Sequence, residues 1–149
     1  MEVKIKKLDP KAVIPVKAHP TDAGFDLTSI SKTLDDKFIE YDTGLAFEIP
    51  EGFVGLVFPR SSNSKKDLLL CNGVAVIDSH YRGPVKLRFR RQLNIDRFGR
   101  GINYPEALYD VGDKVGQIMI MPYPEVTFIE SDILSETDRG GGGFGSSGK

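Results

Sequence analysis

The sequence has few of the residues that build disulfides, metal cages or membrane spans. Its 149 residues include one cysteine and two histidines. A single cysteine cannot form an internal disulfide, and two histidines without neighbouring ligands at suitable spacing do not predict a metal cage. No apolar run approaches the roughly 20 residues that cross a bilayer, and the sequence shows no signal-peptide pattern. We therefore expect a protein of a reducing, cytoplasmic compartment with no membrane association.

An excess of charge of either sign is also missing. Twenty basic side chains stand against 21 acidic ones, which gives no electrostatic footprint for a nucleic-acid polymer or an anionic membrane. The hydrophobic content of 40% suffices for a core in a chain of this length. We expect one globular domain over residues 1–130, followed by a glycine-rich tail over residues 131–149, and any polyanion that it binds is expected to be small.

Helical periodicity is absent from every segment of a dozen residues. Apolar residues instead alternate with polar ones or occur in short runs between Gly, Pro, Asp and Asn. The sequence therefore predicts an all-β sandwich, barrel or jelly roll, because several expected strands lie about 8 to 12 residues apart. A short helical turn is expected within residues 63–69. The expected strands are residues 3–5, 24–27, 44–49, 53–58, 73–77, 85–89, 114–119 and 125–129.

The tail has almost no side chains that could stabilise an ordered state. Residues 143–149 match the start of a G-x-x-x-x-G-K loop, but no preceding strand and no Ser or Thr after Lys149 are present, so we do not expect a P-loop. Successive backbone N–H groups, Arg139 and the hydroxyls of Ser146 and Ser147 suit phosphate oxygens. Phe144 suits stacking on a nucleobase. The alternative interpretation of the tail is a flexible linker.

Three further segments carry polar groups next to expected strands. Arg60-Ser61-Ser62 follows an apolar run and suits an anion, although such turns are more often solvated loops. Residues 112–117 fit either a binding turn or a simple turn into a strand. Residues 72–89 predict a hairpin.

Asp78 directly follows the expected strand at residues 73–77. A carboxylate in this position can be held rigidly near a pocket and act as a general base. The alternative interpretation is that Asp78 only forms the turn. We expect His80 to be a solvated turn residue. Cys71 is expected to be a small core residue rather than a nucleophile.

Five segments, in this order, resemble the motifs of the trimeric dUTPases: residues 22–27, 59–62, 72–83, 112–117 and 139–148. The third and fifth are the most specific. The resemblance implies a distorted jelly roll of the β-clip type, assembled as a homotrimer with active sites at subunit interfaces and exchanged C-terminal tails that close over them. It implies hydrolysis of dUTP to dUMP and pyrophosphate, a reaction that supplies dUMP for dTMP synthesis and keeps uracil out of DNA.

The resemblance also implies residue roles. Asp78 would activate the water that attacks the α-phosphorus, with Mg²⁺ held by the substrate phosphates and waters. Asp26 would either pair with Arg60 or reach the waters on the metal. Uracil and deoxyribose would contact Asn72, Gly73, Ile77 and Tyr81, with Phe144 over the uracil. The remaining substrate-binding residues would be Arg60, Ser61, Ser62, Gln117, Arg139, Gly145, Ser146 and Ser147.

Some features depart from the resemblance. His80 stands where many relatives carry an acidic residue, Ser62 stands where many carry glycine, and the arginine-rich segment from Arg90 to Tyr104 looks longer than usual.

Two alternatives follow. A dCTP deaminase, or the bifunctional deaminase and diphosphatase, shares the fold and the Arg-Ser-Ser segment, but the complete fifth motif and the Ile-Asp-x-x-Tyr pattern favour dUTPase. A regulatory protein would bind a protein partner through Arg90 to Tyr104, in addition to catalysis.

Overall fold

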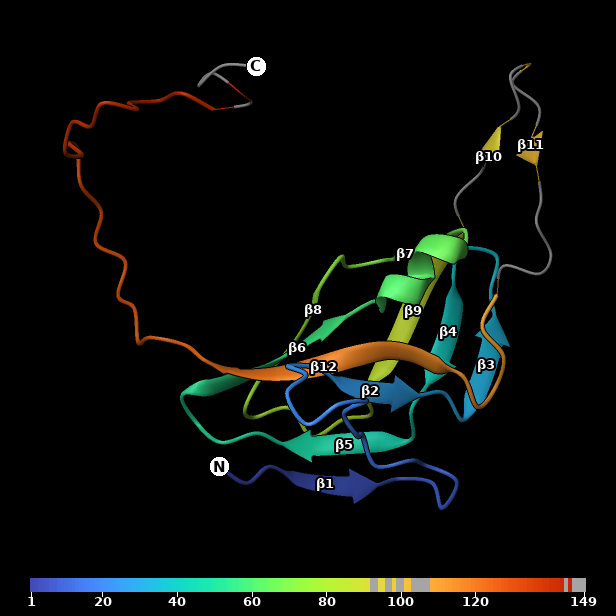
Figure 1. Ribbon diagram of the computed structural model, residues 1–149. Coiled ribbons are helices and arrows are strands. Elements are labelled where there is room, and N and C mark those ends of the chain that lie inside the picture. The colour runs from blue at the N-terminus through green and yellow to red at the C-terminus, as the bar shows by residue number, and fades with distance from the viewer. Residues whose placement is uncertain (92–93, 96–97, 99–100, 103–107, 144, 146–149) are drawn as a thin grey trace.

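The computed structural model describes residues 1–91, 94–95, 98, 101–102, 108–143 and 145. Two four-stranded antiparallel sheets and two small two-stranded sheets carry the described chain (Figure 1), which confirms the all-β prediction. The one helical element among the described residues is the 3₁₀ helix η1, Ser61–Lys65. None of the helical structure described is long and apolar enough to span a membrane.

The first large sheet has the strand order β2-β12-β6-β8. The long strand β12 pairs with β2 on one side and with β6 on the other, and β8 closes the sheet beside β6. A register shift between Lys114 and Gly116 bends β12 where it meets β2. The four strands are β2 (Phe25–Thr28), β12 (Lys114–Pro122), β6 (Phe53–Phe58) and β8 (Ala75–Ile77).

The second large sheet has the order β3-β4-β9-β7. Its strands are β3 (Ser31–Leu34), β4 (Ile39–Asp42), β9 (Lys86–Arg91) and β7 (Leu68–Leu70). The two small sheets pair β1 (Lys4–Lys7) with β5 (Leu45–Glu48) and β10 (Asn94–Ile95) with β11 (Gly101–Ile102). Figure 1 shows β10 and β11 apart from the two large sheets.

The core consists of the inward side chains of alternating strands. On β9, Leu87 and Phe89 are buried while their neighbours along the strand are exposed. Tyr41 of β4, Leu27 of β2 and Ile118 of β12 are also buried, so both large sheets contribute to one core cluster. Each such side chain stabilises the fold by about 1.5–3 kcal/mol relative to exposure. Period-two burial is the physical reason that these segments form strands.

Seven of the eight expected strands are confirmed in position, and the eighth is wrong. Residues 125–129 form no strand, and Val126, Phe128 and Ile129 are exposed. Their composition favours a strand, but a strand needs a neighbouring edge, and the described part of this chain pairs none with them. In Figure 1 the described residues after β12 lead away from the sheets.

Three other local predictions need correction. The predicted hairpin at residues 72–89 is wrong because β8 pairs with β6 whereas β9 pairs with β4 and β7, so the two strands belong to different sheets. The helical turn, expected within residues 63–69, spans Ser61–Lys65 instead, and residues 68–69 belong to strand β7. Cys71 is exposed rather than buried, because it follows β7 at a turn where the alternation of that strand has ended.

Candidate active site

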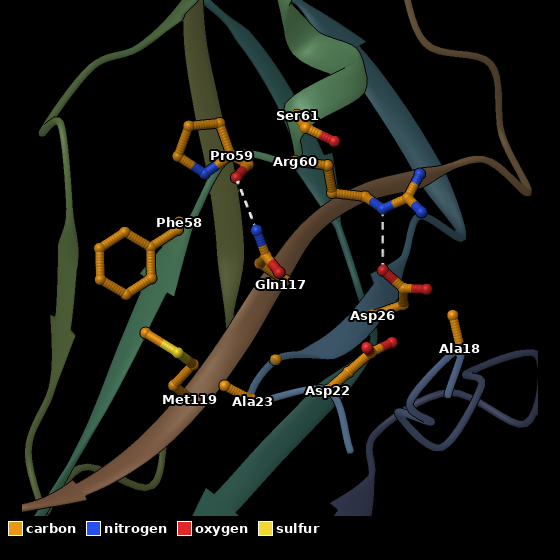
Figure 2. A pocket seen from close by; sticks show the side chains of 11 residues that line it. Ala18, Asp22, Ala23, Asp26, Phe58, Pro59, Arg60, Ser61, Gln117 and Met119 are labelled. Atoms are coloured by element: carbon orange, nitrogen blue, oxygen red, sulfur yellow. Dashed lines mark hydrogen bonds and ion pairs between the residues drawn. The ribbon is translucent and has the colours of Figure 1, made fainter. Parts of the chain in front are cut away.

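One group of predicted residues meets at the end of β6, beside β2 and β12. The strand register places Gln117 opposite both Phe58 and Asp26, so segments far apart in sequence converge there. Arg60 and Ser61 follow directly after β6. These residues line a pocket together with Asp22 and Gly24 (Figure 2). We call it the Arg60 pocket.

Asp26 is the charged centre of the Arg60 pocket. Arg60 Nε donates a hydrogen bond of 2.8 Å to Asp26 Oδ1, and Lys114 Nζ lies 2.7 Å from Asp26 Oδ2. Of the two roles expected for Asp26, the pairing with Arg60 is therefore observed. The Asp26 side chain is only 11% exposed, so its charge is balanced by two cations in a largely desolvated position. Lys114 was not predicted as a site residue, although it lies inside the fourth motif.

The Lys114 contact does not satisfy Asp26 completely. Although the ion pair is short, its geometry is not that of a hydrogen bond, and Asp26 Oδ2 has no hydrogen-bond partner in the part of the chain that the structure describes. A buried carboxylate oxygen with unused acceptor capacity is a suitable partner for a water molecule. Asp26 can thus pair with Arg60 and still accept a hydrogen bond from a water beside a bound cation.

Close contacts explain two glycines of the motifs. A Cβ atom at Gly24 would collide with the side-chain oxygen of Gln117, and one at Gly116 would collide with the Leu87 side chain. Gln117 Nε2 in turn donates a hydrogen bond of 3.1 Å to the Pro59 carbonyl, which fixes its amide beside the Arg60 turn (Figure 2). Glycine at these positions lets β2, β12 and the loop after β6 approach closely.

A second group of predicted residues surrounds Asp78 at the end of β8. Asn72, Ile77, Asp78 and Tyr81 line a pocket with Cys71 and the β9 side chains Lys86 and Arg88. Gly73, in the turn before β8, has a φ of +64°, a left-handed conformation that favours glycine. We call this the Asp78 pocket.

The turn after Asp78 is held by several hydrogen bonds. Tyr81 N donates to the Asp78 carbonyl at 3.0 Å, and the Tyr81 hydroxyl donates to the Pro84 carbonyl at 3.1 Å. Arg82 donates to the carbonyls of Ser79 and Tyr81. A Cβ atom at Gly83 would collide with the Tyr81 ring, so glycine lets the ring lie against the backbone. The ring is thereby presented at a fixed angle in the pocket.

Charged side chains flank the Asp78 pocket on the β4 and β9 strands. Glu40 accepts hydrogen bonds from Lys86 at 2.8 Å and from Arg88 at 2.7 Å. The hydrogen bond from Lys86 is the main reason that the pKa of Glu40 is lowered, and the same bond raises the pKa of Lys86. Glu40 is therefore a charged partner that orders two cations rather than a proton donor at neutral pH.

Within one chain, the Arg60 pocket and the Asp78 pocket lie far apart. They share no lining residue. Pairing of Gly55 with Ile77 puts Asp78 beside the start of β6, near Val54, whereas Arg60 follows the end of β6. Six residues of extended strand span roughly 20 Å. Asp78 and Arg60 of one chain therefore lie too far apart to act on one phosphorus atom.

The remaining predicted site residues lie elsewhere. Ser62 Oγ is buried and does not line the Arg60 pocket. Arg139 Nε donates to the Gly142 carbonyl at 3.0 Å in the exposed tail, where Gly145 has a φ of +84°. Phe144, Ser146 and Ser147 lie outside the described residues.

His80 is confirmed as a solvated turn residue, since its side chain is 82% exposed, 3.5 Å from Glu51. In the described ranges, three or more His, Cys, Asp or Glu side chains nowhere gather in a group that would hold a metal ion.

Comparisons with known proteins identify the family of the chain. The dUTPase family model matches residues 10–99. The deoxyuridine 5′-triphosphate nucleotidohydrolase of Nautilia profundicola is 36% identical, with 100% of both chains covered, and that of Escherichia phage T5 is 36% identical, with 98% of each covered. The Staphylococcus bacteriophage 80alpha dUTPase with dUPNHPP is 28% identical, with 99% of both chains covered and a TM-score of 0.81. The chain therefore belongs to the dUTPase family, whose members are deoxyuridine 5′-triphosphate nucleotidohydrolases.

Proposed function

We propose that the chain releases pyrophosphate from dUTP at sites that each combine the Asp78 pocket of one copy with the Arg60 pocket of another, within a homotrimer. The separation of the two pockets within one chain is the observation that carries the proposal. Three copies related by symmetry would form three equivalent sites, because each copy offers one pocket of each kind. Each copy would keep the distorted jelly-roll form of the β-clip type.

The outer face of the first sheet supports association of copies. The register places Leu56 beside both Val76 and Met119, and Val54 beside Met121, on the side of the sheet opposite the core. Val76 is 60% exposed and Met121 is 43% exposed. A continuous apolar sheet face of this kind is typical of a surface that packs against another subunit.

The Asp78 pocket would hold the nucleoside. Uracil would lie by Asn72, Gly73 and Ile77, where backbone groups near Gly73 and the Asn72 amide would pair with its edge. Cytosine presents a donor where uracil presents an acceptor, and the unpaired groups would disfavour it strongly. The Tyr81 ring would pack against the deoxyribose and leave no room for a ribose hydroxyl.

Asp78 would be the general base. Its carboxylate would take a proton from water as the water oxygen attacks the α-phosphorus, and the bond from that phosphorus to the bridging oxygen would break to release pyrophosphate. Asp78 is exposed in the single chain. A carboxylate at the mouth of a pocket has access to both water and substrate.

The Arg60 pocket would hold the triphosphate through Arg60, Ser61 and Gln117, with the backbone of Ser62. Mg²⁺, when bound by the phosphates and waters, would neutralise charge and polarise the phosphoryl oxygens. The unused acceptor capacity of Asp26 Oδ2 fits a water of that ion. Asp26 would therefore orient the ion indirectly while it also fixes Arg60.

The tail, residues 131–149, would close a site on another copy. Its exposed apolar side chains, Ile133 and Leu134 among them, have no packing partner in the described chain that would keep them on their own subunit. Arg139, Gly145, Ser146 and Ser147 would contact the phosphates, and Phe144 would cover the uracil. The enzyme would act in the cytoplasm, supply dUMP for dTMP synthesis and limit uracil in DNA.

The direct test is pyrophosphate release from dUTP, dCTP, dTTP and UTP with Mg²⁺, for the unmodified chain and for Asp78→Asn. Rapid release that is selective for dUTP and lost in the variant is the expected result. Ammonia or uracil nucleotides formed from dCTP would favour a deaminase instead. Selective binding of dUTP without release by the unmodified chain would reject hydrolysis.

A protein-binding role is a second candidate, in addition to hydrolysis. The strands β10 and β11, within the segment from Arg90 to Tyr104, lie apart from the two large sheets (Figure 1). Phage dUTPases, of which the 80alpha protein is one, control transfer of virulence genes. Deletion of residues 92–104 should abolish partner capture and leave dUTP hydrolysis intact, whereas equal loss of both would indicate misfolding.

A further inference from the structure

Tyr109 lies behind the Arg60 pocket, on the core side of the turn that carries Arg60 and Ser61. It is 3% exposed, and its ring contacts those of Tyr41 and Phe89 at centroid distances of 5.8 and 6.0 Å. The Tyr41 hydroxyl donates to the Tyr109 carbonyl and accepts from the Tyr109 N–H, both at 3.1 Å. The backbone and ring of Tyr109 are therefore fixed by the core before any substrate binds.

The Tyr109 hydroxyl reaches from this core toward η1. It donates a hydrogen bond of 3.2 Å to Asn63 Oδ1. Asn63 in turn donates from its backbone N–H to the Arg60 carbonyl at 2.9 Å and from Nδ2 to the Leu68 carbonyl at 2.7 Å. The Tyr109 hydroxyl thus anchors Asn63, whose backbone N–H closes the turn after Arg60.

Lys66 ties the other end of the same turn to the Tyr109 segment. Its Nζ donates to the Leu108 carbonyl at 2.8 Å and lies 4.7 Å from the centre of the Tyr109 ring. Its backbone N–H donates to the Asn63 carbonyl at 2.9 Å. Residues 108–109 therefore contact the turn at both of its ends.

Ser62 supplies an independent observation. Its hydroxyl is buried and has no well-formed hydrogen bond among the described residues, although a buried hydroxyl normally has one. Burial raises the pKa of Tyr109, and the Ser62 side chain acts in the opposite direction. A phenol can donate to Asn63 and accept from Ser62 at once.

We propose that Tyr109 is a positioning residue for the phosphate-binding turn: through Asn63 it holds Arg60 and Ser61 at the angle at which they face the triphosphate. The inference rests on the proposed function of the Arg60 pocket. The turn has two faces, since Arg60 and Ser61 line the pocket, whereas Asn63 binds the phenol and the Ser62 hydroxyl is buried outside the pocket. A group that locks the rear face sets the geometry of the front face, and small displacements there cost binding.

Tyr109→Phe tests the inference because it keeps the ring in the core and removes only the hydroxyl. In the full chain with Mg²⁺, the KM for dUTP should rise about tenfold while kcat changes less than about twofold, as expected for one lost buried hydrogen bond. The inhibition constant of dUMP should change less than about twofold, because dUMP lacks the β- and γ-phosphates that the turn would bind. Thr43→Val is the matched control, since it removes a buried hydroxyl bonded to the Val85 carbonyl, away from the turn.

A double-mutant cycle with Asn63→Ala asks whether Tyr109 acts through Asn63, which accepts its hydrogen bond. If it does, adding Tyr109→Phe to the Asn63→Ala chain should raise KM by clearly less than it does in the unmodified chain. An unchanged KM in Tyr109→Phe, an equal rise in Thr43→Val, or effects that simply multiply in the cycle would each overturn the inference. Failure of the proposed function would be seen separately, as an unmodified chain that does not hydrolyse dUTP.

Discussion

Mixing two inactive variants provides a quantitative test of whether each site spans two chains. Asp78→Asn removes the base from the Asp78 pocket and leaves the Arg60 pocket intact, and Arg60→Ala does the reverse. Asp26 keeps its ion pair with Lys114 in the second variant, so that chain should lose about 1–3 kcal/mol of stability. Both variants should fold and assemble, and each alone should be inactive.

The expected activity follows from counting. In randomly mixed assemblies at equal proportions, a site between two chains is intact when one chain supplies Arg60 and its neighbour supplies Asp78. Each condition holds with a probability of one half, so about one quarter of the sites should be active in a symmetric trimer. A site contained within one chain would give no recovery, because every chain would carry one defect.

The assay is the initial rate of pyrophosphate release by all assemblies formed on co-expression of the two variants in equal amounts, purified through one tag that both variants carry. A doubly substituted chain mixed with the unmodified chain supplies a control with a different expected value. Sites between chains should again leave about one quarter active, whereas sites within chains would leave about one half. Absence of recovery in the first mixture, together with half activity in the second, would refute the two-chain site.

Three further predictions concern the fold, the metal and the assembly. Because the folded pKa of Glu40 lies below its ordinary value of 4.5, its ionic contribution is fully present above pH 4.5 and is lost as the pH falls through the lowered folded pKa. Glu40→Gln should therefore lower the thermal midpoint at pH 7, and this effect should shrink as the pH falls below 4.5, as followed by circular dichroism. Chelation of Mg²⁺ by EDTA should abolish pyrophosphate release without moving the thermal midpoint, because the described residues form no metal cage, and a large shift by calorimetry would contradict this. Val76→Glu should dissociate the trimer, since it places a charge on the outer apolar face, and should cost nearly all activity; sedimentation as an unchanged trimer would reject that face as an interface.

Short-range alternation identified most of the longer strands that have one buried face. The strands β6, β9 and β12 carry such patterns and were predicted near their observed positions. The strand β3 was not predicted because its four residues are polar or exposed at the edge of a sheet. The strands β4, β7, β10 and β11 were not predicted either, because each has only two to four residues, too few for a pattern to stand out. Pairing partners are also invisible to local patterns, which is why β8 and β9 were mistaken for a hairpin although they belong to separate sheets.

The motifs identified the residues of the site but not that these residues lie in two separate pockets of one chain. Arg60, Ser61 and Gln117 do meet in one pocket, and Asn72, Asp78 and Tyr81 line another. The distance between the pockets depends on which end of β6 each group adjoins, and that follows from register rather than from residue type. Tyr109 carries no motif, so only the three-dimensional contact with Asn63 reveals it.

Residues of these motifs differ in how clearly they report on chemistry. Gly24 and Gly116 leave no room for a Cβ atom, and Asp26 balances two cations, so substitution at any of them alters packing or charge inside the chain as well as substrate contacts. Asp78 is different, because its side chain is exposed and no interaction of the fold depends on it in the described structure. Loss of activity in Asp78→Asn with an unchanged thermal midpoint would therefore report on the reaction itself, whereas the same loss at Gly24 would not separate chemistry from folding.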